Sequence, residues 1–153
     1  MSENGRQVVA RNRKARHEFD ILETFEAGLA LKGPEVKSLR EGKVAFHDAF
    51  ARIERGEAWL YSLHISPYEQ ANRANVDPLR TRRLLLHKQE IRKLVGQVEE
   101  KGLTLVPLDI YFVRGYAKTT IAVARGRKLH DKREVLKRKQ LDREARRAMD
   151  AHR

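Results

Sequence analysis

The stretch LTLVPLDIYFVRGYAKTTIAVA at residues 103–124 determines the fold class of this chain. Two apolar runs, 103–113 and 117–124, flank the dipeptide Arg114-Gly115, and they are rich in the β-branched and aromatic residues that favour strands. A pair of strands joined by a short turn is therefore predicted. The high apolar content of both runs indicates that the two strands are buried.

Further short elements are predicted before this strand pair. An amphipathic helix is expected where apolar residues recur at the spacing of one helix face, at Ile91, Leu94, Val95 and Val98, with Gly102 as its stop. The other expected elements are a first hairpin (a strand from His17, a turn at Ala27-Gly28 and a second strand over 29–32), a short helix over 35–41 after Gly33-Pro34, a second hairpin of strands 50–54 and 58–65 around a turn at 55–57, and a long polar connection over 66–83.

The sequence therefore predicts a mainly β fold. About six short strands and two or three short helices are expected before residue 125. Short antiparallel strands with few helices and a basic exterior are typical of a small β-barrel or a related α+β fold. The oligonucleotide-binding barrel is the leading candidate on these physical grounds.

The positive charge of the chain is concentrated at its two ends. The 153 residues carry a net charge of +12, yet residues 17–124 are nearly neutral. Residues 1–16 have five basic and one acidic side chain, and residues 125–153 have twelve basic and five acidic ones. A basic N-terminal arm, a folded body and a basic C-terminal tail are predicted with these boundaries. The tail combines high helix propensity with a thin apolar stripe, so we expect it to become helical when bound to RNA.

A polyanion is the favoured partner of such a chain, because neutralising phosphates releases their counterions. RNA is favoured over DNA, since no helix-turn-helix or zinc finger is visible to enter a major groove. Solubilising tails and a membrane surface remain open as alternatives, although neither end has the bulky apolar face of an interfacial helix. The candidate RNA contacts form three clusters: Asn12, Arg13, Lys14 and Arg16; Arg80, Arg82 and Arg83; and Arg125, Arg127, Lys128, Lys132 and Arg133.

The sequence lacks the residues that several classes of function require. The chain has no cysteine, which excludes disulfides, thiol catalysis and thiolate metal sites and favours a reducing compartment. The six histidines are scattered, and no phosphate-binding glycine loop or nucleophile elbow is present, so we expect neither an enzyme nor a metal or cofactor site. Asp109, Asp20 and Glu18 leave a metal-dependent nuclease open as a minor alternative. No apolar run suits a membrane span or a signal peptide, so a cytoplasmic location is expected.

Six strings of the sequence occur in an order typical of one protein family. They are NRKARHEF at 12–19, ETFEAGLAL at 23–31, EVKSLREGK at 35–43, HISPYE at 64–69, DPLRTRRLLLHKQEI at 77–91 and GRKLHDKRE at 126–134. In these strings the chain resembles the SmpB family, the small protein partner of transfer-messenger RNA (tmRNA) in bacterial ribosome rescue. The resemblance covers nearly the whole chain.

The resemblance implies an oligonucleotide-binding-like barrel that binds the tRNA-like domain of tmRNA. Protein and RNA together would imitate a tRNA, with the protein in place of the anticodon arm, and would enter the vacant A site of a stalled ribosome. The basic tail would run as a helix into the empty mRNA channel, beside small-subunit rRNA at the decoding centre. Elongation factor Tu is implied as a further partner through the RNA complex, and the protein is expected to be a monomer.

The resemblance also implies roles for individual residues. In the body, the positions near RNA are Asn12, Lys14, Arg16, Glu26, Leu85, His87 and Lys118. Glu26 would accept hydrogen bonds from base amino or imino groups, although the sequence alone favours a surface acid at a turn, and Leu85 could equally be a core residue. In the tail, His130 would stack on a decoding-centre base, Asp131, Lys132 and Arg133 would act in accommodation, Ala148 and Met149 would match an apolar pair that functions in tagging, and Arg127 replaces the usual Lys.

Two other functions are kept as alternatives. A structural ribosomal protein would also combine a basic arm with a globular body, and an RNA-processing enzyme would also bind RNA. Neither alternative explains why the six strings occur together and in order.

Overall fold

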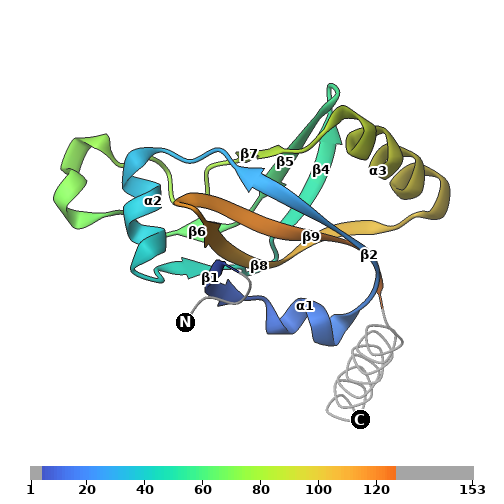
Figure 1. Cartoon of the computed structure of the whole chain (residues 1–153), viewed down its shortest axis with the longest axis horizontal. Coiled ribbons are helices and arrows are strands. Elements are labelled where there is room, and N and C mark those ends of the chain that lie inside the picture. The colour runs from blue at the N-terminus through green and yellow to red at the C-terminus, as the bar shows by residue number, and fades with distance from the viewer. Residues whose placement is uncertain (1–4, 127–153) are drawn as a thin grey trace, which may run out of the picture.

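The computed structural model describes residues 5–126, which form antiparallel β-sheets accompanied by three α-helices (Figure 1). This arrangement confirms the predicted mainly β class. In chain order the elements are β1 (Arg6–Arg11), α1 (Arg13–Glu18), β2 (Phe19–Leu29), α2 (Gly33–Arg40), β3 (Val44–Ala45), β4 (Phe50–Glu54), β5 (Glu57–Tyr61), β6 (His64–Ile65), the 3-10 helix η1 (Glu69–Ala74), β7 (Arg82–Leu85), α3 (Lys88–Lys101), β8 (Thr104–Val113) and β9 (Tyr116–Gly126).

Two hairpins form where the sequence predicts them. β8 pairs with β9 around Arg114 and Gly115, whose φ angles are 51° and 84°. β4 pairs with β5 around Arg55 and Gly56, whose φ angles are 54° and 74°. Two successive positive φ angles are what a two-residue type I′ turn requires, and this turn matches the twist of antiparallel strands. The same Arg-Gly dipeptide therefore makes both turns.

The larger sheet has the strand order β1-β8-β4-β5-β7-β2-β9, and β8 also pairs with β9. All pairings in this sheet are antiparallel. The side chains between the strands form one main core, whose members include Leu39, Leu60, Leu63, Leu84, Leu94, Leu105, Ile110, Phe112, Ile121 and Val123. Burial of these side chains is the main source of stability, because apolar area removed from water contributes roughly 25 cal/mol per Å².

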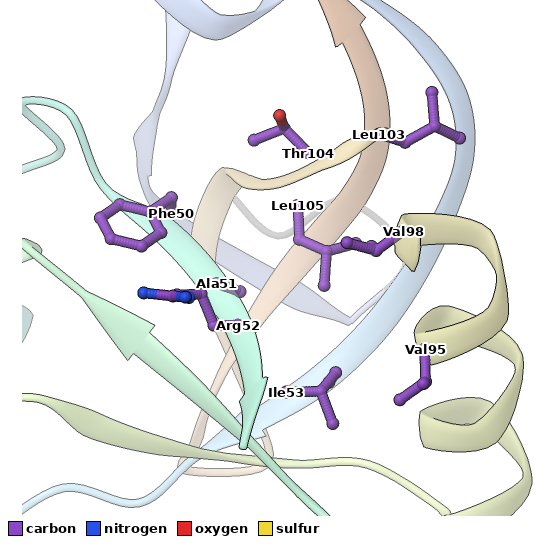
Figure 2. A pocket seen from close by; sticks show the side chains of 9 residues that line it. All are labelled: Phe50, Ala51, Arg52, Ile53, Val95, Val98, Leu103, Thr104 and Leu105. Carbon is purple, nitrogen blue, oxygen red and sulfur yellow. The ribbon is translucent and has the colours of Figure 1, made fainter. Parts of the chain in front are cut away.

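Helices α2 and α3 lie toward opposite ends of the sheet (Figure 1). The predicted amphipathic helix is confirmed as α3, which places Leu94 in the core and ends at Gly102. Val95 and Val98 of α3 line an apolar hollow that also involves Ile53 of β4 and Leu105 of β8 (Figure 2). None of the described helices has the length and apolar composition that a bilayer span requires.

Replacing Gly102 with Ala is expected to lower the free energy of unfolding by about 1 kcal/mol, because an L side chain is strained in the left-handed region. Gly102 has a φ of 62° at the C-terminal end of α3. Gly96→Ala in the same helix is expected to raise the free energy of unfolding by about 0.5–1 kcal/mol. A Cβ at Gly96 would meet nothing within 4 Å. Urea denaturation followed by circular dichroism measures both variants, and effects of the same sign would contradict this explanation.

The predicted first hairpin is wrong. Ala27 and Gly28 do not form a turn, because β2 continues without interruption from Phe19 to Leu29. Gly28 has strand partners on both sides, Leu85 of β7 and Lys118 of β9. The sequence pattern predicts a turn at this glycine, but in the structure the glycine permits a close approach of two strands: a Cβ at this position would lie 3.2 Å from the Cβ of Leu85.

Several short elements were not predicted. Residues 6–11 and 13–18 form β1 and α1, and the polar connection over 66–83 contains η1 and the start of β7. The expected strand over 58–65 is interrupted at Ser62, whose φ of 64° separates β5 from β6. The proposed division of the chain after residues 16 and 124 stays a prediction.

Candidate nucleic-acid interface

Strand register brings residues that are far apart in the sequence into one row. Gly28 of β2 pairs with Leu85 on one side and with Lys118 on the other. Lys118 in turn pairs with Tyr111 of β8, and Tyr111 pairs with Val8 of β1. The row therefore crosses five strands, β7, β2, β9, β8 and β1.

The row belongs to a surface that we call the outer face, defined by Arg83, Leu85, Glu26, Gly28, Lys118 and Tyr111. Strand residues alternate between the two sides of a sheet. Ala27, Ala117 and Thr119 are buried, so their neighbours in β2 and β9 point outward. Leu85 is 51% exposed and lies against Gly28, where no side chain competes for the space. The structure therefore places Leu85 at the surface and not in the core.

Glu26 accepts hydrogen bonds from three donors on the outer face. The Tyr111 hydroxyl lies 2.5 Å from Oε2, the Lys118 ammonium 3.0 Å from Oε1, and Arg6 Nη2 3.2 Å from Oε2. The hydrogen bond from Tyr111, followed by that from Lys118, holds the pKa of Glu26 below its ordinary value and outweighs partial desolvation. Burial, together with the hydrogen bond to Glu26, raises the pKa of Tyr111, so its hydroxyl stays protonated and donates.

Arg6 extends the outer face onto β1. Its guanidinium carbon lies 4.6 Å from the centre of the Tyr111 ring, a cation–π contact, while the same guanidinium binds Glu26. Tyr111 itself is only 1% exposed, so its ring supports Arg6 from below. Glu26 and Tyr111 thus hold two cations, Arg6 and Lys118, in a fixed arrangement.

The three RNA-contact residues predicted near the N-terminus, at the start of α1 and within it, lie in different surroundings. Asn12 is buried at 7% exposure, because its side chain accepts a hydrogen bond from Ala15 N–H and donates one to the carbonyl of Pro107. Lys14 is exposed and forms an ion pair with Asp48 at 3.2 Å. Arg16 is exposed and lines a pocket that reaches Tyr111. Asn12 therefore fixes the start of α1 and is not available as a contact residue.

The prediction that Arg82 contacts RNA is corrected by its burial. Arg82 is fully buried, and it donates to Glu35, to the carbonyl of Leu63 and to the carbonyl of Pro78. Its neighbour Arg83 points outward and pairs with Glu57 at 2.9 Å. The alternation of β7 thus assigns one arginine to the interior and the next to the surface.

The remaining predicted residues fall into two groups. His87 is exposed at the start of α3, directly after the β7 segment, so it borders the outer face. The predicted tail positions Arg127, Lys128, His130, Asp131, Lys132, Arg133, Ala148 and Met149 lie outside the described residues.

Sequence reasoning missed three members of this surface. Arg6, Gly28 and Tyr111 were not predicted as functional residues, although Tyr111 lies in a predicted strand. The six-residue strand β1 gave no clear signal, and only the pairing register links Gly28 to Leu85 and Lys118. The alternation of side chains along β8 places Tyr111 on the same side of the sheet as Asp109. It does not reveal that Glu26, from another strand, lies beside Tyr111.

The residues of the nuclease alternative do not form a metal site. Asp109 Oδ1 accepts a hydrogen bond from the backbone N–H of Thr120 at 3.0 Å. Across residues 5–126, no three histidine or carboxylate side chains gather in a way that could hold a metal ion.

The fold and the outer face define a class: small antiparallel β proteins that present cations and an apolar side chain on one exposed sheet face, a combination suited to nucleic acid. The family model described as SmpB protein matches residues 9–151. The chain belongs to the SmpB family.

Individual relatives are similar over almost their whole length. The SsrA-binding protein of Enterococcus faecalis is 55% identical over 147 residues, which are 96% of this chain and 96% of the relative. The SsrA-binding protein of Thermosynechococcus vestitus is 60% identical over 144 residues, which are 94% of this chain and 95% of the relative. A chain from the solved structure described as "tmRNA-SmpB: a journey to the center of the bacterial ribosome" is 64% identical, with a TM-score of 0.66 over 76% of this chain and 82% of that chain.

Proposed function

We propose that this chain binds tmRNA and acts with it in trans-translation on stalled ribosomes. The observation that carries the proposal is the convergence of Glu26, Leu85 and Lys118 around Gly28 on one exposed sheet face. It occurs in a chain whose relatives are named SsrA-binding protein and whose structural neighbour contains tmRNA and SmpB. The chain binds the tRNA-like domain of the RNA, stands in place of an anticodon arm and brings the RNA to a vacant A site.

The outer face supplies three kinds of contact. Lys118 and Arg83 present cations to backbone phosphates, which position the RNA, while Leu85 offers an apolar surface to a base or ribose. Glu26 holds Lys118 and Arg6 in place. A lone pair of the Glu26 carboxylate that these two side chains do not use accepts a hydrogen bond from a base. His87 extends the contact surface toward α3.

The finer features of the proposal follow the same reasoning. The pairing of β8 with both β4 and β9 supports closure of the sheet into an oligonucleotide-binding-like barrel. The chain acts by binding and not by catalysis, and it works in the cytoplasm, where ribosomes translate. Residues 125–153 form the tail that enters the empty mRNA channel, where rRNA neutralises the repulsion among its twelve basic side chains.

Lys118→Ala is expected to weaken binding to the tRNA-like domain about tenfold, since a charge-assisted hydrogen bond to phosphate is lost. The slope of log affinity against log salt should fall by about 1. Fluorescence anisotropy over a salt series measures both quantities. Lys93→Ala is the matched control: Lys93 also pairs with a glutamate, Glu23 at 2.6 Å, but it lies on α3.

The control variant should retain wild-type affinity and slope. Equal affinity of the wild-type chain for the tRNA-like domain and for an RNA duplex of the same length would contradict the proposed function. An equal loss of RNA affinity in the Lys93 and Lys118 variants would mean that non-specific charge attraction alone accounts for binding. That result would contradict the assignment of the outer face.

A further inference from the structure

We propose that Arg6, Arg11, Arg13 and Arg16 form a binding pocket for one backbone phosphate of the RNA. These side chains, with Val8, Asp109 and Tyr111, line a hollow of about 470 Å³, which we call the arginine pocket. The identity of the ligand rests on the proposed function, whereas the presence of an anion site rests on the geometry alone.

Two consecutive elements bring the four arginines together. Strand β1 pairs with β8 so that Arg11 lies opposite Asp109 and Val8 opposite Tyr111. Helix α1 then begins at Arg13 and carries Arg16 toward the same part of β8. The pocket is therefore continuous with the outer face, because Tyr111 and Arg6 belong to both.

Buried Asn12 fixes the direction of α1. Its side-chain oxygen accepts from Ala15 N–H at 3.1 Å, and its side-chain nitrogen donates to the carbonyl of Pro107 at 2.8 Å. Its backbone N–H donates to the carbonyl of Leu108 at 2.8 Å. Asn12 is thus a positioning residue: it ties the first turn of α1 to β8 and so sets where Arg13 and Arg16 project.

Basic side chains outnumber acidic ones in the lining of the pocket. Its one lining carboxylate is Asp109, and the nearby Glu26 is shared among Arg6, Lys118 and Tyr111. The side chains of Arg13 and Arg16 form no hydrogen bond or ion pair with another residue in the stretch 5–126. Guanidinium groups that surround one hollow repel each other, and an anion that accepts from several of them relieves that repulsion.

A phosphate is the anion that these groups suit best. Guanidinium groups offer planar pairs of N–H donors that match the oxygens of a phosphate. Arg6 is already held by Glu26 and by the Tyr111 ring at 4.6 Å, so little side-chain freedom is lost when it binds. A phosphate here would lie at one end of the row formed by Leu85, Lys118 and Tyr111.

Arg13→Ala and Arg16→Ala test the pocket against a matched control elsewhere in the chain. Lys93 lies on α3, pairs with Glu23 at 2.6 Å and does not line the arginine pocket. Each arginine variant is expected to weaken binding to the tRNA-like domain roughly tenfold and to reduce the salt slope by about 1. Lys93→Ala also removes one positive charge and should change neither quantity.

Titration of the RNA-free wild-type chain with inorganic phosphate provides a second measurement. The Nε–H resonances of Arg13 and Arg16 should shift in a saturable way, and the Lys93 variant should show the same shifts. Saturation by phosphate with no preference for the tRNA-like domain would support the pocket and contradict the proposed function. Three results would overturn the pocket. They are wild-type RNA affinity and slope in both arginine variants, an equal loss in the Lys93 variant, and the absence of phosphate-induced shifts.

Discussion

A chain that ends at Gly126 is expected to bind the tRNA-like domain of tmRNA nearly as tightly as the full chain and to support no peptide tagging. The outer face and the arginine pocket both lie within residues 5–126, so the proposed contacts with that domain remain. The missing residues include the positions proposed to act at the decoding centre and in the mRNA channel. Anisotropy measures RNA binding, and a reconstituted translation system stalled on a message without a stop codon measures tagging.

Loss of bulk positive charge needs its own control, because residues 125–153 carry twelve basic and five acidic side chains. A full-length chain with residues 127–153 in shuffled order keeps the composition and the net charge. It should match the wild type in RNA binding and the truncated chain in tagging. Binding is compared near 0.15 M salt, where charges more than about 8 Å apart are largely screened. If truncation reduced RNA affinity as severely as tagging, the division of labour between body and tail would be wrong.

Local sequence patterns were sufficient for the elements that depend on near neighbours. The Arg-Gly dipeptides at 55–56 and 114–115 predict their turns because each turn needs only two residues with positive φ. Helix α3 was predicted from the periodicity of its apolar side chains, and Gly102 ends it as expected. These features are set within about a dozen residues, so no tertiary information was needed.

The continuous strand β2 could not be predicted in the same way. Gly28 satisfies the pattern of a turn and the pattern of a close strand crossing equally well, and only its two strand partners decide between them. Strands as short as β3 and β6, with two residues each, carry no periodicity to detect. Their existence depends on partners elsewhere in the chain.

The candidate site also combines features that the local sequence predicts with features that only the strand pairing decides. Glu26, Leu85 and Lys118 are implied by the family resemblance, and the register of three strands shows that they lie close together. Composition placed Arg82 and Arg83 in the same cluster, but the sheet buries the first and exposes the second. A basic cluster in a sequence therefore identifies cations, whereas the pleat of the strand decides which of them reach a ligand.

Replacing Glu35 with Ala is expected to lower the free energy of unfolding by about 3–5 kcal/mol, because it leaves a buried arginine without its counter-charge. The Glu35 side chain is 4% exposed and accepts from Arg80 Nη2 at 2.5 Å and from Arg82 Nε at 2.7 Å. The Arg82 side chain is 0% exposed. Urea denaturation followed by circular dichroism measures the loss.

Glu57→Ala is the matched control, because Glu57 pairs with the adjacent Arg83. That ion pair is 2.9 Å long, but its side chains are 50% and 40% exposed. An exposed pair typically contributes at most about 1 kcal/mol, so the control should change the free energy of unfolding little. The double variant Glu35→Leu/Arg82→Met should recover part of the loss, because it removes both buried charges. Equal losses for Glu35→Ala and Glu57→Ala would contradict the importance of burial.

Acid should weaken the same buried pair. Burial opposes ionisation of Glu35, but hydrogen bonds from Arg80 and Lys32 N–H and the charge of Arg82 hold its pKa below the ordinary value of 4.5. A carboxylate with a lowered pKa in the folded state stabilises the protein above its unfolded pKa, and that contribution is lost as the pH falls through the folded pKa. The free energy of unfolding should therefore decrease below about pH 4.5, and it should decrease less steeply in Glu35→Gln. Because Arg82 anchors the strand that exposes Arg83 and Leu85, RNA binding should weaken over the same pH range. An identical dependence of the free energy of unfolding on pH in the wild type and in Glu35→Gln would contradict this role for Glu35.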